Sequence, residues 1–189
     1  MSTNMQMPRY ALVTYVRSPV GEFVEQLRRE LHPEMPHLAA HLTILPPRKL
    51  SGNEREAVEA LTQICRNIDP FEIELGNVET FTPVTPTVFI RVGMESHRLR
   101  DLHDLLGKAD SLRGSEEWPY MPHLTIIKFG SQRPVETALD VARQRWAAFD
   151  GSRRVRIEEL TFVRESENQC WIDLSSVTLG SREAVPTSR

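Results

Sequence analysis

The sequence His-Leu-Thr-Ile occurs twice in this chain of 189 residues, at 41–44 and again at 123–126. Both copies lie in stretches rich in apolar and β-branched residues, which predict β-strands. Side chains two residues apart on a strand share a face, so each histidine points the same way as its threonine. We therefore expect the leucine and isoleucine of each copy to enter the core, and the histidine and threonine to be presented outward.

Two histidines and two hydroxyls around one small volume suit phosphodiester chemistry without a metal ion. Of His41 and His123, one neutral imidazole can take a proton from attacking water while the other, protonated, donates to the departing oxygen. The hydroxyls of Thr43 and Thr125 can donate to non-bridging phosphate oxygens. No cluster of Asp and Glu accompanies the motifs, so a two-metal mechanism lacks ligands. The sequence predicts acid–base catalysis with no metal and no organic cofactor.

The elements that must position these motifs follow the same order in both halves of the chain. Alternating and apolar runs predict strands at 10–16, 39–45 and 71–75, then at 87–92, 121–129 and 154–162, with an extra strand at 169–174. Helices are predicted after Ser18-Pro19, after a capping box at 51–54, from Ser96, and over 134–149. We expect Pro46-Pro47 to end the strand of the first motif. Each half therefore reads strand, helix, strand, helix, strand.

This repetition predicts an α+β fold that is bilobal and internally duplicated, with two antiparallel sheets lining a central cleft and helices outside. We expect one domain over 1–179, with lobes contributed by pseudo-repeats at about 9–80 and 86–177. Residues 180–189 are predicted to form a disordered tail. A pseudo-two-fold axis between the lobes would bring the two polar pairs face to face.

Composition excludes several classes of protein. The chain is 40% apolar and 26% charged, an ordinary globular balance. Its net charge of −3 argues against binding to duplex DNA, although a local pocket for a nucleotide or an RNA end is still allowed. No apolar run approaches the roughly 20 residues that span a bilayer, and no signal peptide is evident, so we expect a cytoplasmic location and no membrane contact. Cys65 and Cys170 are expected to be buried thiols, and no protein partner can be inferred.

The two motifs resemble those of the 2H phosphoesterase superfamily, which is named for two His-x-Thr/Ser motifs in a duplicated α+β fold. Within it the chain looks like the bacterial 2′-5′ RNA ligase-like proteins, which act as RNA 2′,3′-cyclic phosphodiesterases. Met121-Pro122-His123-Leu124-Thr125 is similar to the family's approach to its second motif. The resemblance implies that His41 donates a proton to the leaving group, that His123 accepts one from water, and that Thr43 and Thr125 hold the phosphate. The duplication makes the histidines symmetric, so the residues alone do not order them.

Further candidates lie near the motifs. Many relatives carry an arginine shortly after the second motif, where this chain has Lys128. We include Lys128 as a phosphate ligand, although a regular strand would place it on the face opposite His123. Tyr120 is a candidate for stacking on a base. A metal cluster of His32, His37 and His41 is not expected, because Pro33 and Pro36 break any helix that would align them.

The function favoured by these residues is hydrolysis of an RNA 2′,3′-cyclic phosphate end or a 2′-5′ phosphodiester, with a 2′-phosphate as the product from cyclic ends. The reverse 2′-5′ ligation would use the same acid and base. Three alternatives stay open. The chemistry could act on a small cyclic nucleotide such as ADP-ribose cyclic phosphate, the chain could be a nucleotide- or RNA-binding module without turnover, or the repeated motif could be scaffold.

Overall fold

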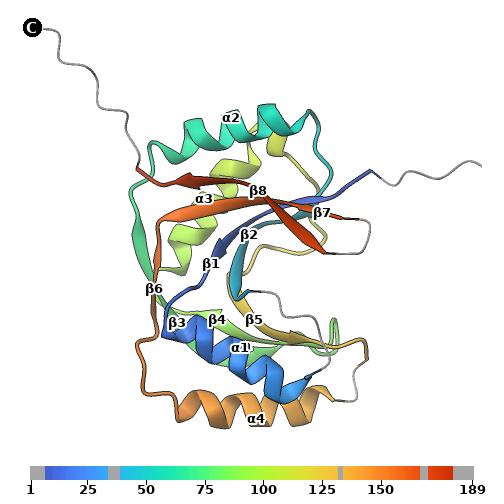
Figure 1. The fold of residues 1–189 in the computed structure, drawn as a ribbon, viewed down its shortest axis with the longest axis vertical. Coiled ribbons are helices and arrows are strands. Elements are labelled where there is room, and N and C mark those ends of the chain that lie inside the picture. The colour runs from blue at the N-terminus through green and yellow to red at the C-terminus, as the bar shows by residue number, and fades with distance from the viewer. Residues whose placement is uncertain (1–6, 34–38, 132–133, 167–169, 181–189) are drawn as a thin grey trace, which may run out of the picture.

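The computed structural model describes residues 7–33, 39–131, 134–166 and 170–180 (Figure 1). Its strands are β1 (Tyr10–Tyr15), β2 (His41–Arg48), β3 (Phe71–Thr80), β4 (Thr87–Val92), β5 (His123–Lys128), β6 (Arg154–Ile157), β7 (Glu159–Glu165) and β8 (Trp171–Thr178). Its helices are α1 (Pro19–Leu31), α2 (Glu54–Cys65), α3 (Ser96–Gly107) and α4 (Val135–Ala147), with a 3-10 turn, η1 (Asp110–Leu112). Apart from Gly180, the predicted tail lies outside the described residues.

All eight strands form one antiparallel sheet in the order β6-β3-β4-β5-β2-β1-β7-β8. The α+β class is confirmed, and the expectation of two separate sheets is wrong. The halves of the sheet join where Leu42 of β2 pairs with Leu124 of β5. Strand periodicity does not show which strands are neighbours. Here β2 and β5, which would each be an edge strand in a two-sheet fold, pair with each other instead.

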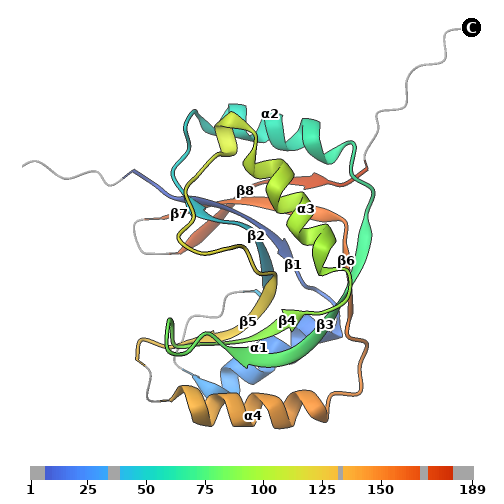
Figure 2. The same ribbon diagram turned by 180° about the vertical axis from the view of Figure 1, so that it is seen from behind.

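The helices lie on the outside of a strongly curled sheet (Figures 1 and 2). Helices α2 and α3 cover the half that contains β2, β1, β7 and β8, whereas α1 and α4 cover the half that contains β3, β4 and β5. The halves of the sequence thus exchange elements, because α1 packs against β5 and α3 packs against β2. No helix among the described residues has the length and apolar character needed to cross a bilayer.

The two faces of the sheet differ as the alternation predicts. Leu42, Ile44, Leu124 and Ile126 are at most 1% exposed and belong to the main core beneath the helices. The histidines and threonines of both motifs are partly exposed on the opposite, concave face. A smaller apolar cluster also lies on that face, formed by Ala11, Val13 and Val163 with Tyr15 and Trp171 packed against it. The predicted inward and outward directions of the repeated tetrapeptide are confirmed.

Three local predictions are corrected. The predicted strand at 154–162 is two strands, since β6 pairs with β3 while β7 pairs with β1 and β8 in the other half of the sheet. The capping box of α2 is formed by Asn53 and Glu56, two residues further along the chain than the predicted box at 51–54. Asparagine is as good an N-cap residue as serine. Strand β2 continues through Pro46-Pro47 to Arg48. Its register against β1 is irregular between Leu45 and Arg48, so the backbone N–H groups that the two prolines lack are not required for pairing there.

Candidate active site

The two motifs lie side by side because β2 and β5 are neighbouring strands. Leu42 pairs with Leu124, and the same antiparallel register places each histidine across from the threonine of the other motif. A pseudo-two-fold axis therefore passes between the two leucines. Because the leucines enter the core, all four polar side chains are presented to the concave face.

Each imidazole is held by the backbone just ahead of its motif. The Nδ1 atom of His41 lies 2.8 Å from the carbonyl oxygen of Ala39, and that of His123 lies 2.7 Å from the carbonyl oxygen of Met121. A carbonyl oxygen can only accept, so Nδ1 carries the hydrogen in both rings and Nε2 of the neutral ring has the lone pair. The partner is two residues upstream in both cases, so the extended chain before each motif fixes the tautomer locally. Both Nε2 atoms are left to exchange protons with a substrate.

Burial lowers the pKa of both His41 and His123 below the ordinary value of 6.5, because poorly hydrated surroundings disfavour the imidazolium form. The bonds to the backbone carbonyls oppose this effect in part. The positive charges of Arg28 and of protonated His123 lower the pKa of His41 further. Charging one histidine therefore makes charging the other harder. This favours the state with one protonated and one neutral ring, which an acid–base pair requires.

Aromatic rings pack edge-on near both histidines. Phe81 and Phe89 approach His123 with ring centroids 5.0 and 5.2 Å away, and the two phenylalanines stack on each other. Tyr15 approaches His41 more loosely, at 6.4 Å and an interplanar angle of 80°. Both histidines therefore have aromatic neighbours, and the neighbouring rings lie closer to His123 than to His41.

Helix α1 ties the two motifs together from behind. Arg28 donates from Nε to the carbonyl oxygen of Ile126 at 2.7 Å and from Nη2 to that of Thr125 at 2.6 Å. One turn earlier on α1, the Glu25 carboxylate accepts a hydrogen bond from the backbone N–H of Ala40, the residue before the first motif, at 3.2 Å. A single helix thus fixes the backbone of β5 and the entry to β2, and with them the spacing of the two histidines.

A β-bulge follows each motif at the equivalent position. Against β1 the register of β2 advances by an extra residue between Thr43 and Leu45, and against β4 the register of β5 does the same between Thr125 and Ile127. Both residues after each threonine are consequently buried. The bulge shifts the alternation, so Lys128 is exposed on the same face as His123. The regular strand assumed from the sequence, which would have turned Lys128 away, is wrong.

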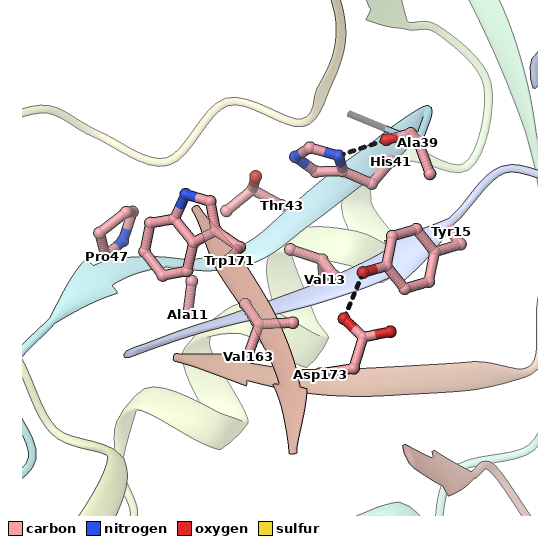
Figure 3. A pocket seen from close by; sticks show the side chains of 10 residues that line it. All are labelled: Ala11, Val13, Tyr15, Ala39, His41, Thr43, Pro47, Val163, Trp171 and Asp173. Atoms are coloured by element: carbon pink, nitrogen blue, oxygen red, sulfur yellow. Dashed lines mark hydrogen bonds between the residues drawn. The ribbon is translucent and has the colours of Figure 1, made fainter. Parts of the chain in front are cut away.

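A pocket of about 410 Å³ adjoins the first motif (Figure 3). Its lining residues come from β1, β2, β7 and β8 and from the segment before β2: Ala11, Val13, Tyr15, Ala39, His41, Thr43, Pro47, Val163, Trp171 and Asp173. Figure 3 shows the indole of Trp171 on one side and the bonded pair of Tyr15 and Asp173 at the other. The volume is in the range of small-molecule sites.

Tyr120 is not among the residues that line this pocket. Its hydroxyl donates to the carbonyl oxygen of Thr43 at 2.9 Å, and one face of its ring stacks on His103 at 4.1 Å. His103 in turn contacts Glu116, which pairs with the buried guanidinium of Arg48. These contacts give Tyr120 a bracing position behind the first motif.

The remaining candidate groups are possible metal ligands and the two cysteine thiols. Among the described residues no three His, Cys, Asp or Glu side chains converge in a way that could hold a metal ion, and His37 lies outside those residues. Cys65 is buried, which raises the pKa of its thiol to about 12. Cys170 is exposed, so the expectation that both thiols are buried is wrong for it.

Comparison with known proteins fits this geometry. The profile of the 2′-5′ RNA ligase superfamily matches residues 16–169, which include both motifs. Of the strands that line the pocket, β2 and β7 lie within the match, whereas β1 precedes it and β8 follows it. The chain belongs to the 2′-5′ RNA ligase superfamily. The 2H phosphoesterase resemblance predicted from the motifs is thereby confirmed.

Curated relatives in the superfamily carry phosphoesterase names. A protein of Oceanobacillus iheyensis named as a candidate phosphoesterase is 30% identical over 125 residues, which cover 64% of this chain and 70% of the relative. A similarly named protein of Bacillus pumilus is 21% identical over 173 residues, 91% of this chain and 98% of the relative. These names and the superfamily support phosphodiester hydrolysis as the general activity.

Solved structures share the fold. A protein of Thermus thermophilus superposes with a TM-score of 0.64 at 14% identity, covering 93% of this chain and all of that one. Escherichia coli LigT in complex with 3′-AMP gives a TM-score of 0.57 at 18% identity, with 92% and 99% covered. Kluyveromyces marxianus Usb1 gives 0.50 at 13% identity, with 90% and 98% covered. At these identities the superpositions establish the fold.

Three residues that line the pocket were not predicted from the sequence. Tyr15, Trp171 and Asp173 line the pocket beside His41, yet none was singled out for a role there. One signal was available, since Trp171 and Asp173 share a face of an alternating strand. What the alternation could not show is that β8 follows β7 and β1 in the sheet, which carries that face to the first motif.

Proposed function

We propose that this protein is a metal-independent cyclic phosphodiesterase that acts on RNA 2′,3′-cyclic phosphate ends or 2′-5′ phosphodiesters through His41 and His123. The observation that carries the proposal is the matched orientation of the two imidazoles. Both donate Nδ1–H to a carbonyl oxygen two residues upstream, so the lone pair of each neutral ring is on Nε2. This matched arrangement supports an acid–base pair, because each ring has one nitrogen available for proton transfer.

In this mechanism His123 is the general base and His41 the general acid. Neutral Nε2 of His123 takes a proton from water as the water oxygen bonds to phosphorus, and the bond from phosphorus to the ribose 3′-oxygen breaks in line with it. Protonated Nε2 of His41 gives its proton to the departing 3′-oxygen, which leaves a 2′-phosphate. The hydroxyls of Thr43 and Thr125 donate to the non-bridging oxygens, and Lys128 adds positive charge on the same face.

The order of acid and base is supported by the family resemblance and by the asymmetry of the site. The pocket lies on the His41 side, where the nucleoside that carries the departing oxygen can be held. If a 5′-hydroxyl attacks in place of water, the same steps form a 2′-5′ bond between two RNA ends. Ligation is therefore the same chemistry with a different nucleophile.

The test is incubation with a short RNA that ends in a 2′,3′-cyclic phosphate, in EDTA, with the phosphate position determined in the product. We expect a 2′-phosphate from the wild type. His41→Asn and His123→Asn should each lose on the order of 10²–10⁴-fold in rate, the usual contribution of a general acid or base. Asparagine can still donate to the upstream carbonyl oxygen, so the loss reports on Nε2 rather than on folding.

His97→Asn is the matched control, because His97 is exposed near the start of α3. A loss below tenfold in either motif variant contradicts the acid–base pair. Saturable binding without turnover would indicate a binding module. Turnover of ADP-ribose cyclic phosphate but of no RNA end would keep the chemistry and change the substrate.

A further inference from the structure

The pocket beside His41 exists because the pseudo-two-fold symmetry of the site is broken in one place. Val13 of β1 is paired with Thr43, and the equivalent partner of Thr125 is Phe89 of β4. Phe89 is 1% exposed and stacks on Phe81 at 4.1 Å, so aromatic rings fill the space on the His123 side. On the His41 side, small side chains leave a cavity of about 410 Å³.

The shape of this cavity matches a flat, partly apolar group. Ala11, Val13 and Val163 form an apolar cluster on the concave face, and Trp171 packs against it. Figure 3 shows the indole standing over these small side chains at one side of the pocket. An aromatic wall beside an aliphatic floor is the kind of surface on which nucleobases stack.

The far end of the cavity presents hydrogen-bond acceptors. The hydroxyl of Tyr15 donates to Oδ1 of Asp173 at 2.6 Å, so the tyrosine oxygen has already committed its hydrogen (Figure 3). Burial raises the pKa of Tyr15 to about 12, which keeps that hydrogen in place at neutral pH. An ionised carboxylate only accepts. A ligand edge that reaches this end must therefore bring donors.

We propose that this cavity is a nucleobase subsite in which the Asp173 carboxylate selects bases that carry an amino group on the Watson–Crick edge and disfavours uracil. The proposal rests on the proposed function, which places the departing 3′-oxygen at His41 and the base of the same nucleoside next to it. Cytosine and adenine offer an exocyclic amino group, and guanine offers an amino group with an adjacent ring N–H. Uracil offers one N–H between two carbonyl oxygens, which would face the carboxylate.

The test compares kcat/KM for the 2′,3′-cyclic phosphates of adenosine, cytidine, guanosine and uridine. We expect the uridine substrate to be the poorest of the four by about tenfold, the lower end of the discrimination given by a good hydrogen-bonded base contact, because Asp173 is exposed to solvent. In Asp173→Asn the side-chain amide can also donate, so the gap should narrow to within about threefold. In Tyr15→Phe the carboxylate is retained, and the preference should persist.

Asp101→Asn is the matched control, since Asp101 is exposed on α3 and lines none of this cavity. Equal kcat/KM for the four substrates, or an unchanged uridine ratio in Asp173→Asn, overturns the subsite. If the wild type hydrolyses none of them, the proposed function is decided by the short RNA with a 2′,3′-cyclic phosphate end, and it fails if that RNA is not hydrolysed either. The ranking is then read from the Kd values of the four nucleoside 3′-monophosphates, and equal or immeasurable Kd values overturn the subsite as well.

Discussion

Arg28 of α1 donates a hydrogen bond to the carbonyl oxygen of Thr125, a residue 97 positions further along the chain. The same guanidinium reaches the next carbonyl oxygen, that of Ile126, and its charge acts on His41 of the other motif. A helix from the first half of the sequence thereby holds β5, the strand of the second motif, and its charge lowers the pKa of the histidine of the first motif. This exchange of elements makes the two motifs one site.

Arg28→Met should therefore affect stability and pH dependence together. Two carbonyl oxygens lose their charged donor, so we expect the free energy of unfolding to fall by about 1–3 kcal/mol. Removing the positive charge raises the pKa of His41, so the pH optimum of kcat/KM should move upward. Denaturant unfolding and a pH–rate profile measure the two effects. Arg29→Met, next along α1 and exposed, should change neither; an unmoved optimum in Arg28→Met would contradict the electrostatic coupling.

The pH dependence of the wild type should be bell-shaped and lie on the acid side. Activity needs one histidine charged and one neutral, and burial lowers the pKa of both below 6.5. Above that pH both rings are mostly neutral and the general acid is lost, so kcat/KM should fall as pH rises through neutrality. A kcat/KM profile from about pH 4 to about pH 9 measures this, and an optimum above about pH 7.5 would be incompatible with the burial of the two rings.

The two threonines should contribute comparably, because the register of β2 and β5 places them in equivalent positions and the proposed mechanism assigns both hydroxyls to the phosphate. Thr43→Val and Thr125→Val each remove one hydroxyl donor while keeping a β-branched side chain suited to a strand. We expect kcat to fall by about 10²–10³-fold in each, as for the loss of one donor to a developing oxyanion. Steady-state kinetics with a cyclic nucleotide measure the loss. Thr62→Val on α2 is the control, and full activity in either motif variant would exclude that hydroxyl as a phosphate ligand.

Substitutions of Tyr120 can distinguish a role in bracing the first motif from a role in stacking on a base. If Tyr120 braces the first motif, its hydroxyl matters, because that group bonds the carbonyl oxygen of Thr43. If it stacks on a base, only its ring matters. From its contacts we expect Tyr120→Phe to lower the free energy of unfolding by about 0.5–1.5 kcal/mol, and Tyr120→Phe and Tyr120→Leu to have similar KM values. A KM raised only in Tyr120→Leu would restore the stacking role.

Leu124 should be a critical residue for stability, because it closes the junction between the two halves of the sheet. It is fully buried and pairs with Leu42, the one paired position recorded between β2 and β5. Leu124→Ala should cost about 2–5 kcal/mol in the free energy of unfolding, measured by denaturant titration. Leu105→Ala removes the same atoms from a side chain that is 44% exposed, and its cost should stay near about 0.5 kcal/mol. Equal costs would argue that the junction is loosely packed.

Local sequence pattern was enough to select the candidate site residues and to predict which way their side chains point. The repeated tetrapeptide identified four candidates, His41, Thr43, His123 and Thr125. Strand alternation correctly predicted that they point outward and that their leucines enter the core. The order of elements was also readable, because helical and strand periodicity are local properties of the chain. Even the orientation of each imidazole is local, since its partner is two residues upstream.

How these segments meet depends on contacts between distant parts of the chain. Pairing of Leu42 with Leu124 made one sheet where two were expected, and the bulge in β5 brought Lys128 to the side of His123. The pocket depends on Trp171 and Asp173 arriving through β8, the last strand of the chain, far in sequence from the first motif. Strand neighbours, register shifts and cavities arise from contacts between distant segments, which the periodicity of one segment does not encode. The asymmetry that distinguishes His41 from His123 is of this kind.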